Sequence, residues 1–170
     1  SWRKILHDGL PRRHIFRRGL GVLNEPVTVC DVTAGFGQDA MMALAMGCHV
    51  TAIEQSPLVF RVLEDAVRRA RLDDKAWAQA LSRFALLEGD ANLLLRSLKT
   101  KPDVIYLDPM FDKPKKHVKS PKPMQLLQAL LGGVADLSEQ EQKLFSVAWE
   151  VVGSRVVVKR PLKAKALRPS

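Results

Sequence analysis

Short apolar runs rich in valine and isoleucine alternate along the chain with longer segments in which apolar residues recur at helical spacing. Bounded runs of the first kind are typical of buried strands, and the longer segments are typical of amphipathic helices. The pattern predicts strands at residues 27–32, 49–54, 84–90, 103–109 and 155–161. It predicts helices at residues 39–47, 56–72, 75–83 and roughly 124–150. Such alternation indicates an α/β fold, a mostly parallel sheet with helices on both faces and right-handed crossovers.

The helix expected over residues 56–72 carries a clear start signal. Ser56 is suited to the N-cap and Pro57 to the first helical position. Gly47 is placed to end the helix before it.

Charged side chains stand at or near the ends of the predicted strands. They are Asp31, Glu54, Asp90, Asp108 and Lys159. In a parallel sheet the carboxyl ends of the strands share one rim, and ligands bind there near the point where the strand order reverses. Four acids from successive strands therefore predict a site at that rim.

The segment "DVTAGFGQDA" (31–40) follows the first strand and holds Gly35, Gly37 and Ala40 in the spacing of a dinucleotide-binding loop. Glu54 ends the next strand, as the acid of that fingerprint does. A nucleotide-dependent reductase is therefore one interpretation. Glycines in such a loop let the backbone approach a bound ligand closely.

Electrostatics favour a different ligand. A pyrophosphate rests on a helix N-terminus, but Asp39 occupies that first turn and Asp31 lies at its entrance. Two carboxylates suit S-adenosylmethionine (SAM), which carries a sulfonium and an ammonium. Glu54 would accept hydrogen bonds from the ribose hydroxyls, and Asp90 from the adenine amine.

The tetrad "DPMF" (108–111) ends the fourth predicted strand. The Asp108 carboxylate and the Pro109 carbonyl offer two acceptors for the N–H groups of an exocyclic amine, which orients the nitrogen lone pair toward a methyl donor. Phe111 offers a stacking face for an extruded base, and Met110 fits a pocket wall. This pattern predicts amine methylation.

The net charge of +9 is unevenly distributed. Residues 1–20, 112–124 and 155–170 hold 17 of the 27 Lys and Arg residues and only two of the 18 acids. A mildly acidic body with basic segments suits a polyanionic partner. The lysines of the loop after the tetrad, Lys113, Lys115 and Lys116, are candidate phosphate contacts, and Lys159 and Arg160 could hold a phosphate or a base edge.

Other features narrow the class of protein. No apolar stretch reaches the roughly 20 residues of a membrane span, and the opening residues lack the apolar region of a signal peptide. The two cysteines are expected to be buried thiols, and the four histidines show no ligand spacing, so we expect no metal site and a cytoplasmic protein.

Four segments, "DVTAGFGQDA", "IEQSP", "YLDPMF" and "VVVKRP", resemble in order and spacing the RsmJ family of bacterial methyltransferases. The resemblance spans roughly residues 27–162. It implies a Rossmann-like class I fold, SAM as cofactor, and methylation of a guanine N2 amine in 16S ribosomal RNA or the small ribosomal subunit. The implied SAM-binding residues are Asp31, Thr33, Gly35, Gly37, Asp39, Glu54, Gln55 and Asp90. The implied substrate residues are Asp108, Pro109, Phe111, Lys159 and Arg160.

Two alternatives stay open at this point. One is a DNA or other RNA amino-methyltransferase acting on adenine N6 or cytosine N4, and the other is a nucleic-acid-binding module without catalysis. We expect a basic N-terminal segment over residues 1–26 and a methyltransferase domain over residues 27–170, both belonging to a partial chain.

Overall fold

The computed structural model describes residues 10–22, 27–109 and 137–161, together with Leu6, Glu25 and Leu167. Several residues discussed above therefore lie outside the described residues. They are Met110, Phe111, Lys113, Lys115 and Lys116. The same holds for the first half of the helix predicted over residues 124–150.

The described residues form a five-stranded sheet in the order β3-β2-β1-β4-β5, with every neighbouring pair parallel. The strands are β1 (Thr28–Asp31), β2 (His49–Glu54), β3 (Phe84–Glu88), β4 (Val104–Leu107) and β5 (Arg155–Val158). The chain moves outward from β1 to β3 and then returns to place β4 on the other side of β1. The carboxyl ends of β1 and β4 therefore flank the switch point of the sheet.

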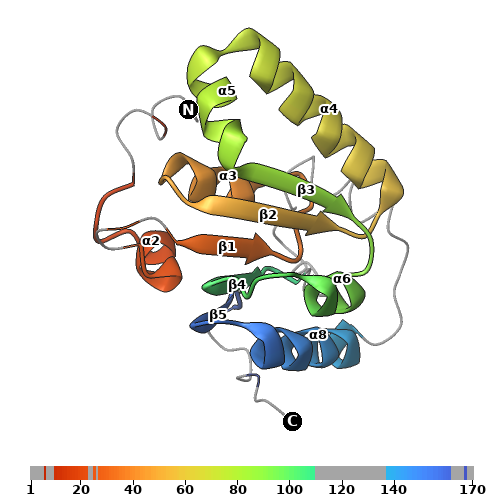
Figure 1. Cartoon of the computed structure of the whole chain (residues 1–170). Helices are drawn as coiled ribbons and strands as arrows, with labels where there is room; N and C mark the ends of the chain where they lie inside the picture. The colour runs from red at the N-terminus through yellow and green to blue at the C-terminus, as the bar shows by residue number, and fades with distance from the viewer. Residues whose placement is uncertain are drawn as a thin grey trace, which may run out of the picture.

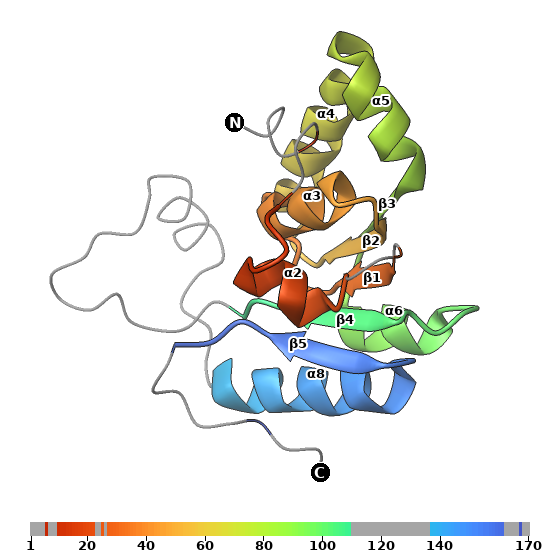
Figure 2. The same cartoon turned by 90° about the vertical axis from the view of Figure 1, so that its left-hand side faces the viewer.

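Helices cover both faces of this sheet (Figure 1). One layer contains α2 (Ile15–Leu20), α3 (Gln38–Ala45), α4 (Pro57–Asp73), α5 (Lys75–Ala80) and the 3-10 turn η1 (Leu81–Arg83). The other contains α6 (Ala91–Ser97) and α8 (Leu137–Val151), which contact each other; in Figure 2, α8 lies beneath β5 and α6 lies beside β4. The predicted α/β class is confirmed.

Alternate residues of β1 and β4 pack against the two helical layers. Val29 and Tyr106 pack with the α3 layer, whereas Cys30 and Ile105 pack with α6 and α8. Each of the four is at most 2% exposed, so β1 and β4 are buried on both faces. This burial explains why their sequences read as continuous apolar runs rather than as alternating ones. Cys30 and Cys48 are buried free thiols, as expected.

The observed strands other than β2 are shorter than the predicted ones, and two of them end for identifiable reasons. β3 ends at Glu88 because Gly89 turns with φ 143° and Asp90 caps the following helix. β4 ends at Leu107 because the backbone N–H of Asp108 donates to Thr33 Oγ1 at 2.7 Å instead of continuing the sheet. The helix predicted from Ser56 and Pro57 begins as expected, with the Ser56 hydroxyl accepting from Val59 N.

Among the helices whose bounds are given above, α2 and α6 were not predicted. α6 has seven residues, too few to show helical periodicity, and the sequence "ANLLLRS" reads as a plain apolar run. α2 lies within the N-terminal basic segment, where Leu20 and Val22 are buried in the same core as α3. The division into residues 1–26 and 27–170 stays a prediction. Within the described ranges, the helices lack the combination of length and apolar character needed to cross a bilayer.

Candidate active site

The loop between β1 and α3 is shaped by two glycines. Gly35 has φ 52° and Gly37 has φ 76°, in the left-handed region that disfavours other residues. A Cβ at position 37 would lie 2.7 Å from Leu63 Cδ1, so close packing against α4 adds a second requirement for glycine. Gly37 is also the N-cap residue of α3. The loop is therefore a tight turn that leads the backbone directly into a helix N-terminus.

Glu54, at the end of β2, fixes that loop. Its Oε2 accepts from the backbone N–H of Gly35 at 2.7 Å, and its Oε1 accepts from Ser56 N at 2.8 Å. The residue is 7% exposed. Gln55 follows it and is exposed. Glu54 thus ties the end of β2 to the glycine loop, and each carboxylate oxygen keeps a second lone pair for a ligand.

Asp90 lies after β3 at the same rim. Its Oδ1 accepts from Asn92 N at 2.7 Å and from Asn92 Nδ2 at 2.9 Å, and it is the N-cap of α6. The residue is exposed. The structure therefore gives Asp90 a capping role in addition to the predicted contact with a ligand amine.

Asp31 is the most deeply buried acid of the site, at 2% exposure. Its Oδ1 accepts from Thr33 N at 3.1 Å and Thr33 Oγ1 at 3.4 Å. The pKa of Asp31 is raised to about 7, mainly by burial and also by the negative charges of Asp39 and Asp108, while the hydrogen bonds from Thr33 act to lower it. A carboxyl with such a pKa gains from a cation placed beside it. Thr33 in turn joins β1 to β4 through the Asp108 backbone.

A charged network links α3, β4 and β5. Lys159 Nζ donates to Asp39 Oδ2 at 2.9 Å and to Asp108 Oδ2 at 2.7 Å. The Tyr106 hydroxyl donates to the same Asp39 oxygen at 2.7 Å. Lys159 is held in place by the sheet, because its backbone N–H donates to Leu107 O at 2.8 Å. Of the residues predicted at the strand ends, Asp108 and Lys159 are therefore brought into contact here.

Arg160 points elsewhere. Its guanidinium Nη2 lies 3.0 Å from Glu141 Oε2 on α8, and both side chains are largely buried, at 20% and 7% exposure. The predicted contact of Arg160 with a phosphate or a base stays a prediction. Pro109 directly follows Asp108 and is half-buried.

Sequence reasoning missed Tyr106. It is the one tyrosine of the chain and sits in a strand whose other residues are aliphatic. Its position two residues before Asp108 gives it the same side of the strand, and a polar tip there needs a partner when buried. That signal could have placed it in the site.

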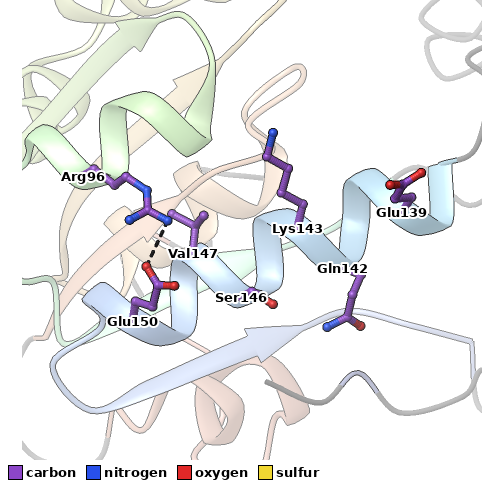
Figure 3. Close-up of a pocket in the computed structure, with 7 residues that line it drawn as sticks. All are labelled: Arg96, Glu139, Gln142, Lys143, Ser146, Val147 and Glu150. Atoms are coloured by element: carbon purple, nitrogen blue, oxygen red, sulfur yellow. Dashed lines mark ion pairs between the residues drawn. The ribbon is translucent and has the colours of Figure 1, made fainter. Parts of the chain in front are cut away.

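A separate depression lies between α6 and α8 (Figure 3). Its charged lining residues include Arg96 and Glu150, which form an ion pair across it at 3.0 Å. None of the predicted site residues lines it. The rim at the switch point is therefore the candidate active site.

Comparisons with known proteins agree with this geometry. The family model described as "Putative SAM-dependent methyltransferase" matches residues 3–170. Curated relatives named ribosomal RNA small subunit methyltransferase J, from Aeromonas salmonicida and Shewanella amazonensis, are 42% and 40% identical to this chain. The matches cover 79% and 84% of this chain and 52% and 57% of those relatives. The chain thus spans about half the length of the curated relatives it matches.

Solved structures give the same result. A SAM-dependent methyltransferase from Neisseria gonorrhoeae superposes with a TM-score of 0.67 at 32% identity, over 89% of this chain and 60% of that chain. A glycopeptide N-methyltransferase solved with SAM has a TM-score of 0.54 at 15% identity, over 83% and 47% of the two chains, and shows the fold alone.

The parallel sheet, the glycine loop after β1 and the acids along one rim together define the Rossmann-like fold of class I SAM-dependent methyltransferases. The chain belongs to the SAM-dependent methyltransferase family whose model matches nearly its whole length. With the relatives above, this confirms the predicted resemblance to the RsmJ family.

Proposed function

We propose that this chain carries the methyl-transfer site of a SAM-dependent enzyme that modifies the exocyclic N2 amine of a guanine in 16S ribosomal RNA. The observation that supports this most directly is the convergence of Asp31, Asp39 and Asp108 beside the glycine loop at the switch point. The name shared by the curated relatives supports the choice of small-subunit RNA. A cytoplasmic location follows from that substrate.

The residues present fit SAM. Within the described part of the rim, Lys159 pairs with Asp39 and Asp108, and Asp31 lies close to the same two carboxylates, so acids outnumber the ammonium and the local field favours a cationic ligand. A pyrophosphate would meet Asp39 in the first turn of α3, which argues against a dinucleotide. Glu54 has acceptor capacity for ribose hydroxyls beyond its two backbone hydrogen bonds, and Asp90 is exposed at the end of β3.

Asp108 and Pro109 are the proposed acceptors for the target amine. SAM supplies, when bound, a methyl group on a sulfonium sulfur that leaves with the electron pair of the C–S bond. The Asp108 carboxylate and the Pro109 carbonyl would accept from the two N–H groups of the amine, so that its lone pair points at the methyl carbon. As the N–C bond forms and the nitrogen becomes cationic, Asp108 stabilises the charge and takes the departing proton.

The basic segments are the proposed RNA contacts. Arg12, Arg13 and Arg18 are exposed in and just before α2, on the same layer of the fold as α3. The loop lysines Lys113, Lys115 and Lys116 follow Asp108 closely in sequence. Phosphate contacts of this kind position a substrate without reading its bases.

The experiment that tests the proposal is methyl transfer from labelled SAM to 30S subunits and free 16S RNA from a strain that lacks the gene. Mass spectrometry of the RNA from that strain, before and after treatment, identifies the modified nucleotide. We expect one N2-methylguanine per RNA with the wild-type protein and none with Asp108→Asn, which retains the shape of the side chain. The Asp108→Asn variant should still bind SAM. Label that appears on duplex DNA, and not on RNA, would overturn the choice of substrate.

A further inference from the structure

Four side chains, from α3 and from the carboxyl ends of β4 and β5, meet around two carboxylate oxygens. Asp39 Oδ2, on α3, accepts from the Tyr106 hydroxyl at 2.7 Å and from Lys159 Nζ at 2.9 Å. The same ammonium donates to Asp108 Oδ2 at 2.7 Å. Tyr106 is therefore connected to the proposed amine acceptor through two intermediates, although it does not touch Asp108 in these hydrogen bonds.

The burial of these groups differs along the network. The Tyr106 residue is 2% exposed, whereas the side chains of Asp39, Asp108 and Lys159 are 17%, 29% and 56% exposed. A half-exposed lysine side chain has many rotamers, and holding one of them costs conformational entropy. The most rigid part of the network is the end that is fixed in β4. Tyr106 is thus the fixed member of the network, and Lys159 is the member whose position depends on the others.

The titratable groups that face Asp108 from the described elements are few. Asp31 faces it from β1, Asp39 from α3 and Lys159 from β5, while Arg160 is engaged with Glu141. Burial raises the pKa of Asp108, Lys159 lowers it and Asp39 raises it again. The charge state of Asp108 therefore depends on where the Lys159 ammonium lies between its two carboxylates.

Tyr106 acts in this network as a hydrogen-bond donor only. Burial, the hydrogen bond to Asp39 and the surrounding carboxylates raise the pKa of Tyr106 far above its ordinary range. Its hydroxyl therefore keeps its proton and satisfies part of the charge on Asp39 Oδ2. Without this donor, Asp39 would draw the Lys159 ammonium toward itself and away from Asp108.

We propose that Tyr106 is a positioning residue: by donating to Asp39 it holds the Lys159 ammonium over Asp108, so that Asp108 meets the target amine as a carboxylate. This inference rests on the proposed function, because it concerns the group that accepts from the amine. When the amine arrives, Lys159 can stay on Asp108 Oδ2 while the other carboxylate oxygen, Oδ1, accepts from the amine. Asp108 is then already ionised when it accepts from the amine, and it does not first have to lose a proton to water.

The test is Tyr106→Phe, which removes the hydroxyl and keeps the ring that packs edge-on against Phe16, with centroids 5.3 Å apart. The titration of the Asp108 carboxyl is followed by carbon-13 NMR in the ligand-free protein and assigned with Asp108→Asn. We expect Tyr106→Phe to raise the titration midpoint of the Asp108 carboxyl. Lys159→Met removes the neighbouring positive charge and should raise that midpoint more, by roughly one to three pH units. Asp39→Asn should lower the midpoint, because a neighbouring negative charge is removed.

Phe16→Leu is the matched control, since it changes the packing of the Tyr106 ring and leaves the hydroxyl bond. It should leave the Asp108 titration where it is in the wild-type protein. The acid limb of the pH profile of methyl transfer, measured at saturating SAM, should move with the NMR midpoint in each variant. A shift in Phe16→Leu equal to that in Tyr106→Phe would mean that packing, and not the hydroxyl, is responsible, and would overturn the proposal.

The outcomes separate this inference from the proposed function. If the wild-type protein methylates RNA and Tyr106→Phe leaves the titration unchanged, the positioning role is wrong and the function stands. If no methyl transfer to RNA occurs, the function is wrong, and the NMR titration still decides how Tyr106 and Lys159 act on Asp108. If Tyr106→Phe does not fold, the Asp108 midpoints of Lys159→Met and Asp39→Asn decide. The proposal is overturned unless the midpoint rises in Lys159→Met and falls in Asp39→Asn.

Discussion

The backbone N–H of Gly35 donates to the Glu54 carboxylate at 2.7 Å, a bond between residues 19 positions apart. It joins the turn after β1 to the end of β2. In the proposed function the loop approaches the methionine part of SAM and Glu54 binds its ribose. The two parts of the cofactor site are therefore joined by a hydrogen bond, and a substitution of Glu54 should also change the conformation of the glycine loop.

Glu54→Gln should weaken SAM binding by about tenfold or more. One amide oxygen can replace only one carboxylate acceptor, so an N–H₂ group would face the N–H of either Gly35 or Ser56, and an unsatisfied buried donor costs about 1–3 kcal/mol. Calorimetric titration with S-adenosylhomocysteine measures the effect. Glu88→Gln is the control, because Glu88 ends β3 beside Glu54 but pairs only at 3.5 Å with exposed Arg61. Equal affinities in the two variants would contradict the prediction.

Gly37→Ala should destabilise the fold by roughly 1–3 kcal/mol, since a non-glycine residue at φ 76° is strained and its Cβ would meet Leu63 at 2.7 Å. Gly19→Ala is the matched control. Gly19 lies in α2 with its added Cβ 3.5 Å from Val157 Cγ1, an ordinary contact, and alanine favours a helix. Urea unfolding followed by circular dichroism should show a lower midpoint for Gly37→Ala and an equal or higher one for Gly19→Ala. A Gly37→Ala midpoint at the wild-type value would show that the loop tolerates a side chain.

Asp31→Asn should stabilise the ligand-free protein at neutral pH. The pKa of Asp31 is raised from 3.8 to about 7 on folding, so the folded state binds the proton more tightly than the unfolded state. The stability that this carboxyl contributes is fully present below pH 3.8 and is lost as the pH rises to about 7. At about 1.4 kcal/mol per unit, the loss has an upper limit of about 4 kcal/mol.

Denaturant unfolding of wild type and Asp31→Asn between pH 4 and 8 measures this difference. The gap between the two free energies of unfolding should widen with pH, while the variant binds SAM more weakly because it lacks the charge. The prediction fails if the gap is constant or narrows. The amide introduced by Asp31→Asn retains an oxygen to accept from Thr33, so the comparison isolates the charge.

Replacing Lys113, Lys115 and Lys116 together by Ala should weaken RNA binding and flatten its dependence on salt. Each lost phosphate contact reduces the slope of log K against log salt by about 0.7–0.9. Filter binding at several salt concentrations gives the slope. A triple replacement of the exposed Lys75, Lys99 and Lys101, which have the same charge, should change it little. Equal slopes in the two triple variants would remove the loop from the interface.

Much of the fold could be predicted because local signals and tertiary structure agree. The Ser56 and Pro57 start signal is used as expected, and β2 matches its prediction to the residue, at His49–Glu54. The placement of Asp31, Asp108 and Lys159 at one rim follows from the parallel topology. α6 was missed because seven residues leave helix and strand patterns indistinguishable.

The ion pairs of the site could not be predicted from the sequence. Lys159 and Arg160 are neighbours, yet one pairs with Asp39 and Asp108 and the other with Glu141 on α8. Both residues directly follow β5, and adjacent residues of an extended segment point to opposite sides, but the partner on each side depends on how the helices pack. Tyr106 was missed for the same reason, since its hydroxyl acquires a role only when α3 brings Asp39 to it.

The bond between Lys159 and Asp39 joins positions 120 residues apart. During synthesis, Asp31, Asp39 and Asp108 all emerge before Lys159, whose ammonium pairs with Asp39 and Asp108. A nascent chain that lacks β5 therefore holds three carboxylates at the rim without that ammonium, and closing so long a loop is slow. Because Val156 and Val158 of β5 pack in the same layer as α6 and α8, the ion pairs of Lys159 form together with the last part of that layer.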